Sequence, residues 1–451
     1  MITMENLQKQ KVLVLGLAKS GTAAAKLLLA NGVNVRINDG SKNIPPEQID
    51  SFQKMGADVI VGAHPLSVLD RIDLIVKNPG IPYTHPLVVA AEARNIPIIT
   101  EVELASSIVP AENMIAVTGS NGKTTTTTLI VEMLTSSGIK AQVSGNIGSV
   151  ATEVAQNLEQ DEKMVIECSS FQLLGVETFK PKVAVLLNIY EAHLDYHQTF
   201  SNYQQAKWNI FKQQTEEDFL VYNDDDPLVK AAIHQAKSNV VPFSTTKKLP
   251  KGAWSDDTSL YYQNEAIIDI QSMPLVGSHN IDNALAAIAV AKLNGATNEG
   301  IREVLQSFSG VKHRLQFVDN INGRLFYNDS KATNVLATEK ALSAFQNKSI
   351  ILLAGGLDRG NDFEALIPLL KHVKGLIVFG ETAEKLRIVG RKANIEHVVA
   401  VESMQEAVQA AYEISEEKDI ILLSPACASW DQYETFEERG DMFIQAVHTL
   451  V

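Results

Sequence analysis

The sequence predicts an α/β protein with three domains, each built around a mostly parallel sheet. Short runs of β-branched and aliphatic residues alternate with helical patterns along the whole chain. Several of these runs end in a glycine-containing turn that leads directly into a helical segment, as in parallel β–α–β units. The length of 451 residues suits about three domains, and we expect them at residues 1–104, 105–309 and 310–451.

The first domain is expected to hold a helix over residues 22–30 and strands over residues 11–15, 33–37, 73–76 and 97–100. Its first turn, Gly16–Gly21, resembles the dinucleotide-binding fingerprint, but Ala18 replaces the middle glycine. Asp39 ends the second strand, where an acidic side chain accepts a ribose hydroxyl. Because the Ala18 methyl group would crowd a pyrophosphate, we interpret the domain as Rossmann-like, with a nucleotide diphosphate bound in a different pose. Redox binding of NAD is the less favoured alternative.

The second domain is predicted to contain a nucleotide-phosphate site at Gly119–Thr125, directly after an apolar strand over residues 114–117. Backbone N–H groups of such a turn converge on an anion, and the N-terminus of the helix that begins near Thr124 adds partial positive charge. Lys123 can reach the terminal phosphates, and the Thr124 hydroxyl can ligate Mg²⁺. Val117 stands where the usual loop has a further glycine, so this loop is a shorter variant. We therefore favour a central domain of the P-loop ATPase type over a plain glycine turn.

Polar side chains follow two further strands of the second domain. Glu167 comes after an apolar run, and on spacing alone a Mg²⁺ ligand and a cap of the next helix are equally supported. His193 and Asp195 lie beyond the end of another strand, which favours contact with metal or phosphate. Glu191, between the same strand and His193, is interpreted as part of a solvated loop. The two strands are expected over residues 165–167 and 183–187.

The remainder of the second domain carries weaker signals. Lys207 lies in a plausible helix, and spacing alone indicates a solvated lysine. The polar, turn-rich region over residues 223–271 is expected to form an antiparallel excursion. Asn280 and Asn283 border a helix predicted over residues 281–293, where they could cap the helix or bind a base, and capping is favoured.

The third domain is expected to contain strands over residues 350–353, 376–379 and 420–423, each ending in a turn. Arg314, Lys331 and Arg359 are cations near such turns or near the start of the domain, and they suit phosphate or carboxylate. The turn over residues 424–429 is rich in small residues. Together with the Gly119–Thr125 loop, these turns favour an enzyme with several binding sites over a structural protein.

Composition excludes several classes of partner. A formal net charge of −14 argues against generic binding to nucleic acid or to anionic membranes, both of which need basic surfaces. No apolar stretch reaches the length that spans a membrane, and the first residues do not form a signal peptide. Cys168 and Cys427 both lie in apolar runs and are interpreted as buried thiols in a reducing cytosol. We expect a cytoplasmic protein, and a monomer.

Taken together, the motifs resemble those of the Mur ligase family over nearly the whole chain. The matching segments are residues 118–125, 167–172, 193–195, 207, 279–283, 313–314, 329–334 and 424–431. The last two segments resemble the branch of the family that adds D-glutamate. The resemblance implies an ATP- and Mg²⁺-dependent ligase that joins D-glutamate to UDP-N-acetylmuramoyl-L-alanine in peptidoglycan synthesis, through an acyl phosphate.

The resemblance also implies roles for individual residues. Lys123, Glu167, His193 and Lys207 would be catalytic, and Thr124 with the last three would hold two Mg²⁺ ions. Lys207 would carry a carbamate. ATP would contact Gly119, Ser120, Asn121, Gly122, Lys123, Thr124, Thr125, Asn280, Asn283, Arg314 and Asp329. The UDP-substrate would contact Lys19, Ser20, Asp39, Asn78 and Asn146. D-Glutamate would contact Lys331, Thr333, Arg359, Ser429 and Phe436, with Arg359 standing where the family pattern has lysine.

Three other functions stay open at this level. The first is a sister Mur ligase or an enzyme similar to folylpolyglutamate synthetase, which would share the central domain. The second is a dehydrogenase built on the Gly16 turn, which leaves the Gly119 loop unexplained. The third is a nucleotide-dependent regulatory module, which would turn over ATP without a muramoyl nucleotide.

Overall fold

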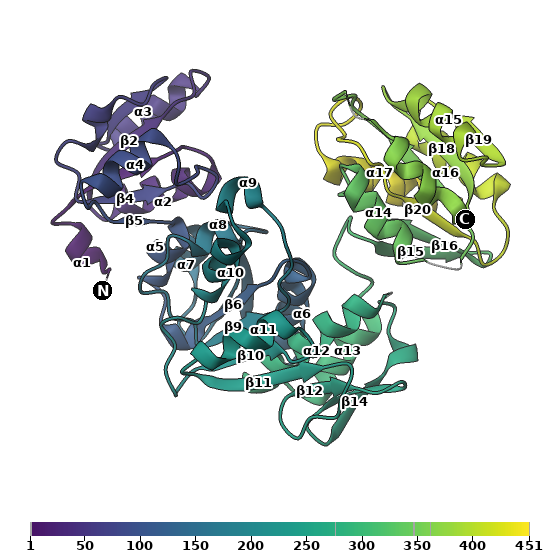
Figure 1. Ribbon diagram of the computed structural model, residues 1–451, viewed down its shortest axis with the longest axis horizontal. Coiled ribbons are helices and arrows are strands. Elements are labelled where there is room, and N and C mark those ends of the chain that lie inside the picture. The colour runs from purple at the N-terminus through teal and green to yellow at the C-terminus, as the bar shows by residue number, and fades with distance from the viewer. Residues whose placement is uncertain (1, 276, 346–347, 361, 451) are drawn as a thin grey trace. The chain divides into compact units, whose positions relative to one another are not determined.

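The computed structural model describes residues 2–275, 277–345, 348–360 and 362–450. The chain forms two compact units, the first comprising residues 1–272 and 279–305 and the second residues 273–278 and 306–451. Three sheets with helices around them confirm the predicted α/β class with mostly parallel strands (Figure 1). The predicted domain boundaries at residues 104 and 309 fall between these sheets and stay predictions.

The N-terminal sheet is entirely parallel, with strand order β3-β2-β1-β4-β5. Its strands are β1 (Lys11–Leu15), β2 (Asn34–Asp39), β3 (Asp58–Val61), β4 (Leu74–Lys77) and β5 (Ile98–Ile99). The accompanying helices are α1 (Met4–Leu7), α2 (Lys19–Ala30), α3 (Pro46–Lys54), η1 (Leu66–Leu69), α4 (Pro86–Ala93) and α5 (Glu101–Ser106). Helix α2 begins three residues before the predicted Thr22. Gly21 lies inside it and packs against the Gly16 carbonyl, where a Cβ would come within 1.8 Å.

The central sheet has the order β14-β13-β12-β11-β10-β9-β6-β8-β7. Its strands are β6 (Met114–Thr118), β7 (Ala141–Gly145), β8 (Lys163–Glu167), β9 (Val183–Leu186), β10 (Phe219–Asn223), β11 (Asn239–Ser244), β12 (Ala253–Ser255), β13 (Ser259–Tyr262) and β14 (Glu265–Asp269). Only the β12–β13 and β13–β14 pairs are antiparallel. The antiparallel excursion predicted over residues 223–271 is therefore wrong for its first half, because helix α11 (Pro227–Ala232) returns the chain to form β11 parallel to β10.

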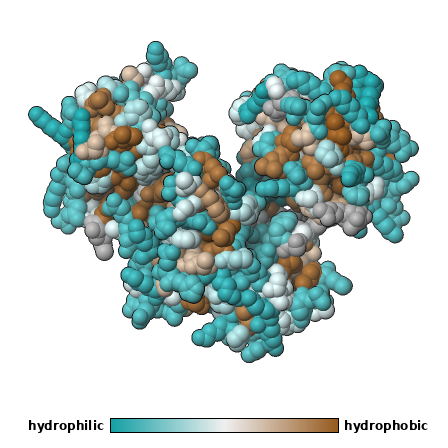
Figure 2. Space-filling model, in the orientation of Figure 1, coloured by the Kyte–Doolittle hydropathy of each residue, from teal (hydrophilic) through white to brown (hydrophobic). Residues whose placement is uncertain are grey.

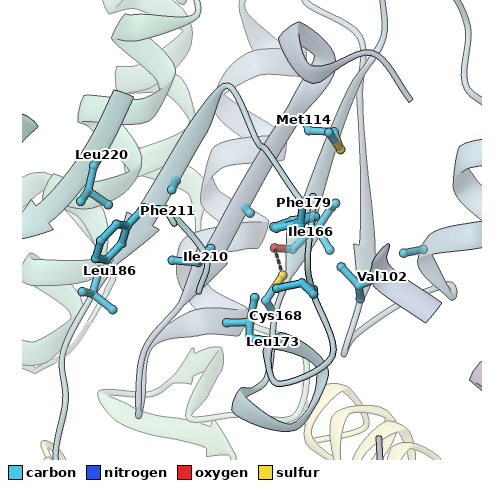
Figure 3. Packing of buried hydrophobic residues seen from close by; sticks show 14 of the residues in the cluster. Val102, Met114, Ile166, Cys168, Leu173, Phe179, Leu186, Ile210, Phe211 and Leu220 are labelled. Carbon is cyan, nitrogen blue, oxygen red and sulfur yellow. Dashed lines mark hydrogen bonds between the residues drawn. The ribbon is translucent and has the colours of Figure 1, made fainter. Parts of the chain in front are cut away.

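Helices complete the central part of the chain. They are η2 (Ala111–Asn113), α6 (Lys123–Ser136), α7 (Ala151–Asn157), α8 (Ser170–Leu173), α9 (Leu194–His197), α10 (Phe200–Trp208), η3 (Ile233–Gln235), η4 (Ile270–Ser272), α12 (Ser278–Leu293) and α13 (Asn298–Ser307). One hydrophobic core brings Met114, Ile166 and Leu186 of the sheet together with Phe211 and other buried side chains (Figure 3). Cys168 lies in this core and is fully buried, as predicted.

A hydrogen-bonded seam joins the N-terminal segment to the central one within the first unit. The Thr100 hydroxyl donates to the Gln172 carbonyl at 2.7 Å, and the Thr100 N–H donates to the Gly175 carbonyl at 2.9 Å. The fully buried Glu103 carboxylate accepts from three successive backbone N–H groups, those of residues 177–179, at 2.8–3.0 Å. Buried polar groups need such partners, so these contacts stabilise the junction between helix α5 and the central segment.

The second unit contains a sheet of order β15-β16-β20-β17-β18-β19, in which only the β15–β16 pair is antiparallel. Its strands are β15 (Gln316–Ile321), β16 (Arg324–Asn328), β17 (Ile350–Gly355), β18 (Val373–Phe379), β19 (His397–Ala400) and β20 (Ile420–Leu423). Its helices are α14 (Val335–Ser343), η5 (Glu364–His372), α15 (Ala383–Lys392), α16 (Met404–Ile414) and α17 (Phe436–His448). Hydrophobic side chains alternate between two buried clusters along the strands, which explains the nearly continuous apolar runs in their sequences.

Hydrophilic side chains dominate the face shown in Figure 2. Among the described residues, no helix combines the length and the apolar character needed to cross a membrane.

Candidate functional site

The Gly119–Thr125 loop joins strand β6 to helix α6, as predicted. Gly122 has a left-handed backbone (φ 83°), and a Cβ there would come within 2.1 Å of the Asn283 Oδ1. A Cβ on Gly119 would come within 2.9 Å of the Leu187 Cβ. Both glycines are thus required by close neighbours as well as by the turn itself.

A neighbouring segment holds this loop from the side of strand β9. The Asn121 N–H donates to the Asn188 Oδ1 at 2.9 Å, and the Ser120 N–H donates to the Asn188 carbonyl at 2.9 Å. The Ser120 hydroxyl donates to the Tyr190 carbonyl at 3.1 Å. Because β9 pairs directly with β6, the sheet brings this segment to the loop.

Lys123 is the first residue of the 14-residue helix α6. Its Nζ donates to the carbonyls of Gly119 and Ser120 at 2.9 and 3.1 Å. The ammonium group is therefore held beside the loop, next to the backbone N–H groups at the start of α6. A helix N-terminus with an adjacent cation is a site suited to phosphate.

Glu167 ends strand β8 and is 1% exposed. Its Oε2 accepts from the Thr124 hydroxyl at 2.8 Å, and its Oε1 accepts from the Asn146 amide at 2.7 Å. The alternative role as a helix cap is wrong, because Ser169 caps α8 in a capping box with Gln172. A hydroxyl and a carboxylate side by side at the phosphate loop are hard oxygen ligands, which fit Mg²⁺.

Lys207 of helix α10 is 1% exposed, so the solvated lysine indicated by spacing alone is wrong. Its Nζ donates to the Gly119 carbonyl at 2.8 Å, reaches the Thr118 hydroxyl at 3.5 Å and lies 4.8 Å from the centre of the Tyr203 ring. Burial, followed by repulsion from Lys123, holds the pKa of the Lys207 amine well below its usual range. The charged form of this amine is therefore less favoured than that of an exposed lysine.

His193 and Asp195 lie in the exposed segment after β9, as does Glu191. The His193 ring lies 5.0 Å from the Phe171 ring and 6.3 Å from that of Tyr203, which also contacts Lys207. Desolvation, and then Lys207, lower the pKa of His193. Within the described part of the chain no three His, Cys, Asp or Glu side chains form a metal-binding group, so the ligand set with Thr124 and Lys207 stays a prediction.

Asn280 and Asn283 lie inside helix α12, which begins at Ser278, so the favoured capping role is wrong. The Asn283 amide donates to the Asn280 Oδ1 at 3.1 Å, and the Asn283 Oδ1 accepts from the Thr126 hydroxyl at 3.3 Å. Asn283 is thus fixed beside the phosphate loop, close to Gly122.

Three side chains at this site were not predicted from the sequence. Tyr203, one helical turn before Lys207, pairs its hydroxyl with that of Ser120 at 2.9 Å, and its spacing of four residues from Lys207 was an available signal. His197 is buried, pairs with the Ser170 hydroxyl at 2.9 Å and has a pKa lowered to about 4 by desolvation. Lys77 is fully buried at the end of β4.

The predicted UDP-substrate residues fall into two places. Around the Gly16 turn, the Asn78 amide donates to the Ser20 hydroxyl at 3.1 Å, and Asp39 accepts from the Leu17 N–H at 2.7 Å. Lys19 is exposed at the start of α2. Asn146 is instead bonded to Glu167, at the phosphate loop.

In the second unit, Asp329 follows strand β16 and is 6% exposed. Its carboxylate accepts from the Ser424 hydroxyl at 3.0 Å and from the Leu315 N–H at 3.2 Å. Burial raises the pKa of Asp329 to about 7, although these bonds and the nearby Arg314 oppose the rise.

The buried Arg439 joins the loops that carry the predicted D-glutamate residues. Its guanidinium donates to the Ser330 and Cys427 carbonyls at 2.8 and 3.0 Å, beside Lys331 and Ser429 in the chain. The Lys331 Nζ lies 5.4 Å from the centre of the Phe436 ring. The Thr333 N–H donates to the Lys331 carbonyl at 2.9 Å. The Arg439 guanidinium and this tight turn therefore hold Lys331, Thr333 and Ser429 on neighbouring loops. Arg359 lies instead over Trp430.

Three family models cover most of the chain. The models are the Mur ligase MurD-like N-terminal domain (residues 10–100), the Mur ligase middle domain (117–291) and the Mur ligase glutamate ligase domain (313–427).

Curated relatives match from end to end. A protein of Oceanobacillus iheyensis named UDP-N-acetylmuramoylalanine--D-glutamate ligase is 60% identical over 450 residues, covering 100% of both chains. The Bacillus subtilis protein of the same name is 52% identical over 452 residues, covering 99% of this chain and 100% of the relative.

Solved structures show the same fold. The Thermotoga maritima UDP-N-acetylmuramate-alanine ligase superposes with a TM-score of 0.57 at 20% identity, covering 98% of this chain and 100% of that one. A UDP-N-acetylmuramoyl-L-alanyl-D-glutamate--2,6-diaminopimelate ligase gives 0.58 at 19% identity, covering 97% and 92%. With the end-to-end relatives and three matching family models, the conclusion is direct: the chain belongs to the Mur ligase family.

Proposed function

We propose that the protein is an ATP-dependent ligase that joins D-glutamate to UDP-N-acetylmuramoyl-L-alanine, a step of peptidoglycan precursor synthesis. The observation that carries the chemistry is the cluster of Thr124, Glu167 and Lys207 around the Gly119–Thr125 loop. The choice of substrates is supported by the end-to-end relatives that carry this name at 52–60% identity.

The reaction needs a leaving group on the substrate carboxylate, since oxide is a very poor one. In the proposed mechanism the carboxylate attacks the γ-phosphorus of ATP and gives an acyl phosphate and ADP. The amine of D-glutamate then attacks the acyl carbon, loses a proton and displaces phosphate. The negative charge of the phosphates repels the incoming carboxylate unless cations and dipoles offset it. Lys123 and the loop N–H groups bind the phosphates and supply this positive charge.

Thr124 and Glu167 fit one Mg²⁺, and Glu167, His193 and a carbamate on Lys207 would hold a second. Bound Mg²⁺ neutralises phosphate charge. Lys207 suits carbamate formation because its amine has a lowered pKa and, among the described residues, no carboxylate within ion-pair distance. A neutral amine adds CO₂ and releases a proton, which turns an uncharged buried group into an anionic ligand.

The remaining substrate contacts are proposed from the family resemblance. ATP would also contact Asn280, Asn283, Arg314 and Asp329. The UDP-substrate would contact Lys19, Ser20, Asp39, Asn78 and Asn146. D-Glutamate would contact Lys331, Thr333, Arg359, Ser429 and Phe436. These sets belong to proposed domains at residues 1–104, 105–309 and 310–451. All of them come from one chain, so we propose a monomer, acting in the cytoplasm where its nucleotide substrates are made.

Phosphate release from ATP tests the function directly. The protein is incubated with UDP-N-acetylmuramoyl-L-alanine, Mg²⁺ and one amino acid from a panel of D-glutamate, L-glutamate and L-alanine. We expect release only with D-glutamate and only when the muramoyl nucleotide is present. Release with L-alanine or L-glutamate instead would assign the chain to a sister ligase, and release without the nucleotide would indicate a regulatory ATPase.

A further inference from the structure

An exposed arginine–tryptophan contact lies at the carboxyl ends of strands β17 and β20 in the second unit. The Arg359 guanidinium carbon lies 4.5 Å from the centre of the Trp430 ring. Trp430 is 65% exposed, more than any other large hydrophobic side chain in the described ranges. An exposed indole does not gain the free energy of burying its apolar surface. Its position over a cation therefore suggests a role other than packing.

The charge of Arg359 is not part of an ion pair within the described residues. No carboxylate among the described residues lies within ion-pair distance of its guanidinium, although the adjacent Asp358 is paired with Lys385 at 2.6 Å. Stacking occupies the flat face of a guanidinium, whereas its five N–H donors radiate in the plane. The Trp430 ring therefore restricts the Arg359 guanidinium, and no ion pair with a described carboxylate takes up its donors, so they are available to an anion from outside.

The residues beside Trp430 add unused hydrogen-bonding groups. The Ser429 hydroxyl is buried and has no partner within the part of the chain that is described, and the same is true of the Asp431 Oδ1. The Leu357 N–H donates to the Ala428 carbonyl at 2.9 Å, which joins the turn after β17 to the turn after β20. A cation and an unpaired hydroxyl thus share one sheet edge, where parallel α/β sheets bind their ligands.

We propose that Trp430 is a positioning residue that holds the Arg359 guanidinium as a preformed fork for a carboxylate of the incoming amino acid. This inference rests on the proposed ligase function, which makes an amino acid the substrate of this unit. It also explains why arginine suits position 359 in this chain. Arginine stacks on an indole and binds a carboxylate with two parallel hydrogen bonds, whereas lysine offers a single point charge.

The test compares Michaelis constants in the full-length protein. Trp430→Leu removes the aromatic face, and we expect KM for D-glutamate to rise about two- to fivefold, the effect of an exposed cation–π contact. Turnover at saturating D-glutamate and KM for ATP stay unchanged, while Trp430→Phe, which keeps an aromatic face, loses less. Ile388→Ala is the matched control, because Ile388 is another exposed apolar residue of this unit and takes no part in the stack.

A double-mutant cycle with Arg359→Lys separates positioning from a general disturbance of the loop. If Trp430 acts through Arg359, the penalty of Arg359→Lys is smaller in the Trp430→Leu protein than in the parent. Equal penalties in both backgrounds, or an unchanged KM in Trp430→Leu, would overturn the proposal. Tryptophan emission gives a second readout: D-glutamate should change it more in the parent than in Trp430→Phe, which keeps Trp208 and Trp254, when the muramoyl nucleotide and a non-hydrolysable ATP analogue are present.

Failure of the proposed function gives a different result. If D-glutamate supports no turnover in the parent but another amino acid does, the function is wrong, and the same cycle is run with that amino acid. The α-carboxylate of that amino acid offers Arg359 the same two oxygens. The coupling energy between Trp430 and Arg359 is then measured with that substrate and tests the positioning role of Trp430.

Discussion

Lys207 and Gly119 are joined by a hydrogen bond, in which the buried Nζ donates to the loop carbonyl at 2.8 Å. This contact ties helix α10 to the phosphate loop and places an amine of lowered pKa at the centre of the proposed chemistry.

Lys207→Ala is expected to abolish turnover, because the carbamate proposed as a metal ligand is lost. Small carboxylates such as formate should restore part of the activity by entering the vacated space as anionic ligands. Phosphate release with and without formate is the measurement. Lys212→Ala is the control, since Lys212 is an exposed lysine five residues further along the chain. Full activity of Lys207→Ala without any additive would contradict the proposed role.

Lys123→Ala should reduce turnover by at least about 100-fold, because one charge that offsets the γ-phosphate in the transition state is lost. Its thermal midpoint should change little, since the hydrogen bonds that the Lys123 Nζ donates to the Gly119 and Ser120 carbonyls lie within its own loop, four and three residues away. Phosphate release and a melting curve give the two readings. Lys140→Ala is the control, because Lys140 is an exposed lysine beyond the same helix, and it should retain parental activity. Normal turnover in Lys123→Ala would contradict the proposed role of Lys123 in phosphate binding.

Asp329 predicts a pH-dependent difference in stability. Its folded pKa of about 7 lies above the unfolded value, so the native state binds more protons between about pH 4 and pH 7. The stability it contributes is therefore present at low pH and is lost as the pH rises through 7, by at most about 1.4 kcal/mol per pH unit.

Asp329→Asn removes this titration while keeping the shape of the side chain. The melting temperature of the variant relative to the parent should increase from pH 5.5 to pH 7.5. A difference that is constant across this range would show that Asp329 titrates as an ordinary surface carboxyl.

Lys77 is expected to position the loop that carries Asn78. Its buried Nζ donates to the Ile81 carbonyl at 2.7 Å and lies 3.2 Å from the Tyr196 hydroxyl, which itself donates to the Pro79 carbonyl at 2.9 Å. Burial lowers the pKa of Lys77 to about 8. The charged ammonium is therefore disfavoured by desolvation, and these hydrogen bonds offset part of that cost.

Lys77→Met keeps an unbranched side chain that is one atom shorter and removes the donors. We expect KM for the muramoyl nucleotide to rise severalfold, because Asn78 is in its proposed site, while KM for ATP changes less. Steady-state kinetics with each substrate varied in turn distinguish the two. Equal rises in both constants would indicate a general loosening of the fold.

The sequence predicted the elements whose residues are buried on both faces, such as β1, β6, β17 and β20, because continuous apolar runs identify them. Strands β3 and β19 were missed, since their residues are half-buried or exposed and leave only weak patterns.

The phosphate loop was predictable because its residues are consecutive and their chemistry is rare. Lys207 was misjudged from spacing because its burial arises from packing against Gly119, which lies 88 residues earlier in the chain. Lys77, Tyr203 and Arg439 were missed for the same reason, since a cation or hydroxyl is classed as solvated until the tertiary structure encloses it.

The Thr100 and Glu103 seam has a consequence for how the chain unfolds. The alternation of strands and helices along the chain suggests independent modules, yet the fully buried Glu103 carboxylate of α5 accepts hydrogen bonds from three N–H groups of the central segment, those of residues 177–179. Melting of the N-terminal sheet that releases α5 would leave these N–H groups without their acceptor, so we expect it to destabilise the central sheet as well. We therefore expect the first two predicted domains to unfold together, although each has a sheet of its own.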